Sequence, residues 1–385
     1  MSNNTTLLLS RRDNSTLFAF AMVMYAIAGG FFLLLVGQEA LRGENVFQFF
    51  ADSNTYLSTY AGTAENFDGR IVAIDSNYLG PLTLLRLLGG NIYLVMLANI
   101  YMFTHSVIHI CNLLKLNPLK VGFLLMLSPI TCSSLLSVNK EIFIFPFFAL
   151  AMNAYVRRSL ASLVLAMFVS ILVRWQLLGF YFMIIGILHV RLFKSRSAVV
   201  LSLLLGISGF YLAIGEFITP ILAYVENSID TYDAGGSGLF EMVLGLQNKG
   251  LYFLVFPLKA FHLLFGMGLK VDRVFSPIEI YNDLFVGGHC LVAFIAFCFL
   301  CKRRKLTMRS DLIYISLLFL AVFAITPVFA PRYLYPVFVL WVIVLAGAPE
   351  SMARHKKTPS LFRFLNISAS EPDAAFASDR KHSSI

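Results

Sequence analysis

Long apolar segments recur from residue 17 to residue 348, and they constrain the fold of this chain more than any other feature. Of its 385 residues, 58% are hydrophobic and only 13% are charged, whereas a soluble domain is about a quarter charged. An α-helix needs about 20 apolar residues to cross a bilayer. The sequence therefore predicts an all-α, polytopic membrane protein. No cleavage site follows 17–37, so we interpret this segment as a retained first span.

About ten transmembrane helices are predicted. The loops that join them alternate between cationic and anionic along the chain. Cationic loops face the cytoplasm in most membrane proteins, so we expect both termini to be cytoplasmic. The net charge of +9 then reflects membrane topology, and no nucleic-acid partner is expected. The expected spans are 17–37, 91–114, 120–137, 142–156, 159–173, 177–190, 198–225, 284–301, 311–328 and 334–348.

Residues 1–348 are predicted to form one transmembrane domain with two long outer loops, 38–90 and 226–283. Each loop is expected to hold an interfacial helix. The first helix is 77–90, and the second is 251–268, which is interfacial or re-entrant. If 251–268 crossed the bilayer, the basic residues at 302–305 would lie outside, against the positive-inside rule.

The polar tail 349–385 is expected to be cytoplasmic and disordered. The five cysteines form no CxxC pair, and most lie inside apolar segments. Neither disulfides nor thiolate-bound metals are therefore expected. His105 and His109 share one helix face, but no third metal ligand accompanies them, which favours packing inside the bundle.

Charged groups are expected at the outer ends of several spans: Asp52, Lys140 with Glu141, Arg174, and Arg332. A charge at the membrane boundary costs little, so each one alone is compatible with a simple snorkelling role. Together they suit the chemistry of a lipid-linked sugar. A carboxylate can take the proton of an acceptor hydroxyl, and cations can stabilise a leaving phosphate.

The sequence thus predicts Asp52 as the catalytic base. It lies directly after the first span, among small polar residues and a tyrosine. The remaining candidates are assigned to substrate binding: Tyr56, Lys140, Glu141, Arg174, Arg332 and Tyr333.

The order of these elements resembles the GT-C superfamily of integral-membrane glycosyltransferases. Segment 52–56 resembles its acidic first-loop motif, and 78–90 resembles its interfacial helix, which contains proline. Segment 127–141 resembles the paired short spans three and four. Residues 332–336 resemble the Arg-Tyr-x-x-Pro start of a late span.

The resemblance implies transfer of a sugar from a polyprenyl-(pyro)phosphate donor to a glycan or glycolipid acceptor. The reaction would occur at the outer face of a bacterial cytoplasmic membrane. The lipid bilayer, the donor and the acceptor would be the partners. The first loop holds no acidic doublet, so no metal ligands are assigned; a divalent metal stays open as an alternative.

Two other functions stay open. The motif Asn139, Lys140, Glu141 and the long second outer loop resemble Wzy-like polymerases of O-antigen and capsule repeat units. A flippase for a lipid-linked saccharide is the alternative from another class. A transporter places its paired charges near the middle of the bilayer, whereas only Glu216 is expected to be deep here.

Overall fold

The computed structural model describes residues 2–41, 51–62, 76–189, 195–230, 238–266, 281–325 and 331–352. Every element in these ranges is a helix, so the all-α prediction is confirmed for the described chain. The predicted disordered tail lies outside the described residues from 353 onward.

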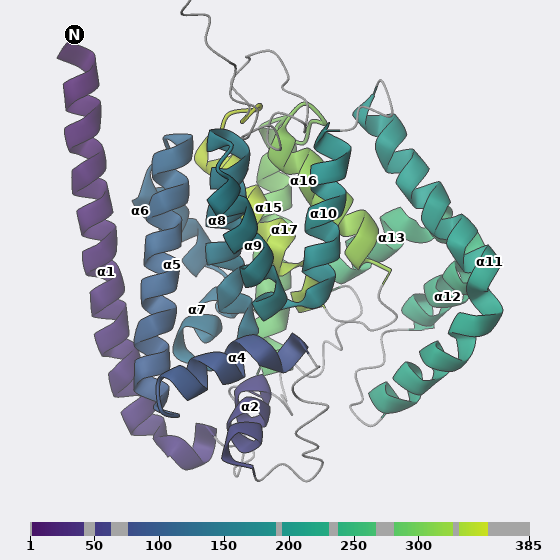
Figure 1. Ribbon diagram of the computed structural model, residues 1–385, viewed down its shortest axis with the longest axis horizontal. Helices are drawn as coiled ribbons and strands as arrows, with labels where there is room; N and C mark the ends of the chain where they lie inside the picture. The colour runs from purple at the N-terminus through teal and green to yellow at the C-terminus, as the bar shows by residue number, and fades with distance from the viewer. Residues whose placement is uncertain are drawn as a thin grey trace, which may run out of the picture.

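The first half of the chain forms a row of helices beside one long N-terminal helix (Figure 1). Most of these helices begin or end within two or three residues of the predicted spans. The elements of this half are α1 (Ser2–Leu41), α2 (Ala51–Ala61), α4 (Ser76–Leu87), α5 (Ile92–Leu114), α6 (Pro118–Met126), α7 (Pro129–Leu136), η1 (Lys140–Phe143), α8 (Ile144–Arg157), α9 (Leu160–Val173) and α10 (Trp175–His189).

The second half packs α15, α16 and α17 against this row and adds α11 to α13 at one side (Figure 1). The predicted segment 251–268 is a helix, α13. The elements are α11 (Arg196–Asp230), α12 (Gly238–Leu246), η2 (Gln247–Leu251), α13 (Tyr252–Phe265), η3 (Tyr281–Val286), α15 (Gly287–Lys302), α16 (Asp311–Phe323), η4 (Pro331–Leu334) and α17 (Tyr335–Ala346).

Among the described residues, four segments are long and apolar enough to cross a membrane: 12–36, 92–114, 196–213 and 284–302. The bent pair α6 and α7 raises the count to five. The shorter helices α8, α9, α10, α16 and α17 have 12 to 15 residues each. At ~1.5 Å per residue, they extend about 18–22 Å, less than the ~30 Å of a hydrocarbon core.

The predicted span 120–137 is not one straight helix, because the chain bends by 93° between α6 and α7. Pro129 begins α7 and pushes the preceding residue out of the helical region. Ser128 is accordingly extended, with φ −81° and ψ 121°. The Ser128 hydroxyl lies 2.8 Å from His289 Nδ1 on α15, so the bend is tied to a distant helix.

The predicted helix 77–90 is present as α4, which lies across one end of the row of helices (Figure 1). Gly80 allows its close approach to α9. A Cβ atom added at Gly80 would lie 2.3 Å from the carbonyl oxygen of Leu172 and 3.0 Å from the ring of Phe143. Helix α4 therefore touches both the end of α9 and the turn η1.

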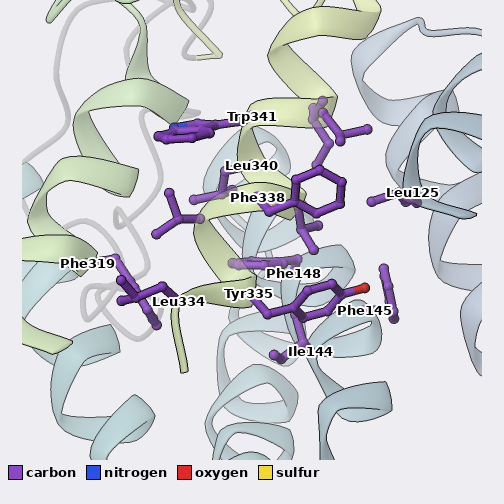
Figure 2. Packing of buried hydrophobic residues seen from close by; sticks show 14 of the residues in the cluster. Leu125, Ile144, Phe145, Phe148, Phe319, Leu334, Tyr335, Phe338, Leu340 and Trp341 are labelled. Carbon is purple, nitrogen blue, oxygen red and sulfur yellow. The ribbon is translucent and has the colours of Figure 1, made fainter. Parts of the chain in front are cut away.

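Helix α17 occupies the centre of the hydrophobic core (Figure 2). Tyr335, Phe338 and Trp341 are almost fully buried. The ring of Tyr335 packs edge-on against Phe145 of α8 at a centroid distance of 6.2 Å. Trp341 Nε1 donates a hydrogen bond to Ser316 Oγ on α16. These contacts fix the start of α17 against α8 and α16.

Basic residues collect at the end of the bundle where α17 stops, which we call the basic end. Lys120 Nζ donates to the Ala346 carbonyl oxygen, and Lys305 Nζ donates to that of Val344, both at 3.2 Å. Cations favour the C-terminal end of a helix because its carbonyl groups carry partial negative charge. The turn η4 leads directly into the start of α17 and so lies at the opposite end.

Candidate functional site

A small pocket lies at the end of the bundle opposite the basic end, where α8, α10 and α17 begin and α9 and α16 end. Its volume is about 20 Å³, little more than one water molecule needs. Its lining combines charged and phenolic residues with apolar ones. The lining residues are Glu141, Ile144, Val173, Arg174, Leu177, Phe319, Phe323, Arg332, Tyr333 and Pro336.

Arg174 reaches the pocket because the chain turns sharply between α9 and α10. The residue caps α9 in an extended conformation, with φ −167° and ψ 135°, and its N–H donates to the Ser170 carbonyl. Its own carbonyl accepts from the Leu177 N–H at 2.9 Å. The backbone thus links both helices, and the side chain is held over the pocket.

Glu141 pairs with this arginine. Its Oε1 lies 3.3 Å from Arg174 Nη2, and its side chain is 3% exposed. The turn that carries it is set locally, because the Asn139 side chain accepts a hydrogen bond from the Glu141 N–H at 3.1 Å. Asn at this position is a typical N-cap. The predicted charges at 141 and 174 are therefore direct partners.

Tyr333 joins the two arginines of the pocket. The guanidinium carbon of Arg174 lies 3.8 Å from the centroid of its ring, and that of Arg332 lies 6.0 Å from the same centroid. Both distances fall within the range of a cation–π interaction. Because the ring covers one face of the Arg174 guanidinium, the N–H groups at its edge stay oriented for hydrogen bonds.

Two phenylalanines form an aromatic wall in the lining of the pocket. Phe319 and Phe323, one turn apart on α16, stack with their rings 9° from parallel and their centroids 4.0 Å apart. Phe180 of α10 packs edge-on against Phe319 at 5.1 Å. Sequence reasoning missed this wall, since phenylalanine is common throughout the chain and only its packing distinguishes these two.

The segment around Asp52 docks beside the Glu141 turn. Ser53 Oγ accepts a hydrogen bond from the Val138 N–H at 3.3 Å. Tyr56 and Val138 are buried in one small apolar cluster with Leu82 of α4. Asp52 belongs to α2, and its side chain lies outside the described part of the structure.

The structure brings four of the predicted site residues together in one pocket: Glu141, Arg174, Arg332 and Tyr333. It places two others elsewhere. Tyr56 packs edge-on against Tyr78 at 5.5 Å, within the apolar cluster. Lys140 is buried but does not line the pocket.

Lys259 is a second feature that the sequence analysis did not single out. It is fully buried in α13, and its Nζ donates to Gln247 Oε1 and to the Ile325 carbonyl oxygen. Gln247 Nε2 in turn donates to the Tyr211 hydroxyl at 2.7 Å. A lone lysine in the apolar segment 251–268 was the available signal, because ionisable residues at such positions are rarely incidental.

The expected packing of the histidine pair inside the bundle is seen only in part, because His105 is exposed and His109 is half-buried. The rings of His105 and His109 stack at 6.4 Å, and His105 is exposed on the outer surface of α5. Within the described residues, no three His, Cys, Asp or Glu side chains come close enough to hold a metal ion. Glu216 belongs to α11, and its side chain lies outside the description.

No protein-family model, no curated protein and no solved structure matches this chain. The chemistry of the pocket therefore has to be argued from its own geometry. It combines a buried carboxylate, two guanidinium groups, a phenol and an apolar wall. Such a set can bind an anionic group that is attached to an apolar chain.

Proposed function

We propose that this protein is an integral-membrane glycosyltransferase, which moves a sugar from a polyprenyl-(pyro)phosphate donor to a surface polysaccharide or glycolipid acceptor. The observation that carries the proposal is the convergence of Glu141, Arg174 and Arg332 in one pocket. Sugar transfer from a phosphate needs a carboxylate for the acceptor proton. It also needs cations for the charge that develops on the leaving phosphate.

In this proposal the chain crosses a bacterial cytoplasmic membrane ten times, with both termini in the cytoplasm and the pocket at the outer face. The basic end supports this orientation, since Lys120 and Lys305 lie there and cationic loops stay cytoplasmic. The short helices cross as parts of a bundle. Helix α17 is surrounded by protein, so its length does not have to match the thickness of the bilayer.

Arg174 and Arg332 are the proposed phosphate ligands. A guanidinium is a planar fork that can bind two phosphate oxygens at once. Tyr333 covers the face of the Arg174 guanidinium, which leaves the N–H edge for the phosphate. The first units of the polyprenyl chain would lie against the wall of Phe319 and Phe323. The present pocket volume of about 20 Å³ means that the side chains must move apart when the donor enters.

Asp52 remains the base predicted from the sequence. Support for its presence near the pocket comes from the contact between Ser53 and Val138, three residues before Glu141. Two carboxylates, Asp52 and Glu141, thus belong to neighbouring segments at this end of the bundle.

A Wzy-like polymerase of lipid-linked repeat units is the second candidate. It is favoured by the presence of two arginines in one pocket beside the Asn139 turn. A flippase is less well supported, because the Glu141–Arg174 pair lies at helix ends. A transporter would place such a pair near the middle of its helices.

Glycolipid analysis of a strain that lacks this protein separates the three functions. A glycan without one branch sugar, restored by the wild-type gene, supports the transferase. Single repeat units without long chains would instead indicate a polymerase. Lipid-linked intermediates that accumulate at the cytoplasmic face would indicate a flippase, and unchanged glycolipids would contradict all three.

A further inference from the structure

We propose that Glu141, rather than Asp52, receives the proton of the acceptor hydroxyl, and that its Oε2 is the accepting atom. The inference rests on the proposed sugar transfer and assigns the catalytic base of that same pocket. Glu141 was predicted from the sequence only as a substrate-binding residue. The assignment follows from the different surroundings of its two carboxylate oxygens.

The two oxygens of Glu141 have distinct environments. Oε1 accepts a hydrogen bond from Arg174 Nη2 at 3.3 Å. Oε2 is fully enclosed, yet it has no hydrogen-bond partner among the described residues. Buried polar atoms in proteins are almost always paired, and an exception calls for an explanation. Glu141 lines the pocket, so when the side chains move apart to admit the substrates, this oxygen can accept a hydrogen bond from a bound hydroxyl group.

The Arg196–Asp311 pair at the basic end shows what a structural ion pair looks like in this chain. Asp311 Oδ1 pairs with Arg196 Nη2, and Asp311 Oδ2 accepts from the Met352 N–H at 2.9 Å. Both oxygens are used, and together they tie α11, α16 and the segment after α17. Among the described residues, Glu141 forms an ion pair through Oε1 only. Ion pairing therefore explains the placement of only one of its two carboxylate oxygens.

The backbone around Glu141 holds the carboxylate in place. The Asn139 side chain caps the turn through the Glu141 N–H, and the Glu141 carbonyl accepts from the Ile144 N–H where α8 begins. The N-terminal end of a helix favours negative charge. These contacts hold the carboxylate in a fixed position, which a general base requires before the acceptor arrives.

The reaction step balances without any further reagent. Glu141 Oε2 takes the proton as the acceptor oxygen forms a bond to the anomeric carbon of the donor sugar. The bond from that carbon to the phosphate oxygen breaks, and its electron pair stays on the polyprenyl phosphate. Arg332 and Arg174 neutralise the charge that develops there. The proton leaves Glu141 to water after the products separate.

The test compares Glu141→Gln with Asp52→Asn in the purified full-length protein. The substrate is the lipid-linked saccharide that accumulates in the deletion strain. Glutamine keeps a carbonyl oxygen for Arg174 but cannot take the proton. We expect the turnover of E141Q to fall by about 10²–10⁴-fold, while its affinity for a short-chain polyprenyl phosphate stays within about threefold. We expect Asp52→Asn to lose less than about tenfold.

Asp311→Asn is the matched control, because it weakens the other ion pair and leaves the pocket unchanged. It should lower the melting temperature but keep the turnover of the folded protein. Added formate should restore part of the turnover to Glu141→Ala, since a small carboxylate can replace the missing base. If Glu141 had only a structural role, formate would not restore turnover to a Glu141→Ala protein that still binds the donor.

The outcomes separate the inference from the proposed function. If E141Q keeps wild-type turnover while D52N loses it, the inference fails and the glycosyltransferase assignment stands with Asp52 as the base. If E141Q loses polyprenyl phosphate affinity and turnover equally, Glu141 positions Arg174 and is not the base. If the wild-type protein transfers no sugar at all, the proposed function fails as well.

Discussion

The guanidinium of Arg174 lies over the ring of Tyr333, with its central carbon 3.8 Å from the ring centroid. The two residues are far apart in the sequence: Arg174 lies between α9 and α10, and Tyr333 lies in η4 just before α17. The same guanidinium also holds Oε1 of Glu141. One arginine thus connects the carboxylate and the phenol of the pocket, and each prediction below depends on that connection or on the helices that support it.

Replacing Tyr333 tests the contact between the ring and Arg174. Tyr333→Phe keeps the aromatic face, so we expect near wild-type turnover and stability. Tyr333→Leu removes the face and should lower turnover by about 5- to 30-fold, since a desolvated cation–π contact contributes about 1–2 kcal/mol. The measurement is sugar transfer by each purified variant. Equal activity in the leucine and phenylalanine variants would show that the ring only fills space.

Arg332 can be tested with a change that keeps its charge. Arg332→Lys retains the cation but loses the planar fork that binds two oxygens. We expect it to lose most of its affinity for a short-chain polyprenyl phosphate, and Arg332→Ala to lose more. Donor affinity and turnover should be measured separately. Wild-type values for the lysine variant would mean that Arg332 only marks the membrane boundary, and Arg174 would then be the main phosphate ligand.

Gly80 tests how α4 supports the pocket. An added Cβ would meet the Leu172 backbone at 2.3 Å and the ring of Phe143 at 3.0 Å, so α4 would be pushed away from α9 and η1. We expect Gly80→Ala to reduce the free energy of unfolding by about 1–3 kcal/mol and to reduce transfer. Gly179→Ala on α10 is the control, because its Cβ would meet no atom within 4 Å. Similar melting temperatures for the two variants would refute the close packing.

Membrane topology can be checked with reporter fusions along the chain. We expect fusions after residues 75, 235 and 330 to report the outer side, and fusions after residues 195 and 305 to report the cytoplasm. The physical reason is that Lys120 and Lys305 mark the basic end, which cationic residues hold in the cytoplasm. A cytoplasmic signal at residue 235 would mean that the spans after it cross the membrane in the opposite direction. It would contradict the proposed position of the pocket at the outer face.

Much of the helical layout could be predicted from the sequence, because its causes are local. Continuous apolar runs produce helices, and residues such as Asn91, Asn117 and Ser159 cap them through their own side chains. The bend within the expected span 120–137 also has a local cause. Pro129 disfavours a helical conformation at the residue before it, Ser128 is extended, and the chain bends there by 93°.

The candidate site was predictable only in part. Counting helices places residues 141, 174 and 332 at the same end of the bundle, because each lies where the chain turns at that end. The count does not reveal that Glu141 pairs with Arg174, or that Tyr56 lies in an apolar cluster with Val138. Nor does it distinguish Phe319 and Phe323 from the other phenylalanines of the chain.

The sequence by itself determined the all-helical fold, most of the helices, and the end of the bundle at which Glu141, Arg174 and Arg332 lie. These features follow from apolar length, capping and loop charge, which act over a few residues. Only the tertiary structure decided which charges touch and that Glu141 Oε2 has no partner within the described part of the chain. Such contacts depend on how each helix is rotated and shifted against its neighbours, and the packing of side chains distant in sequence sets both.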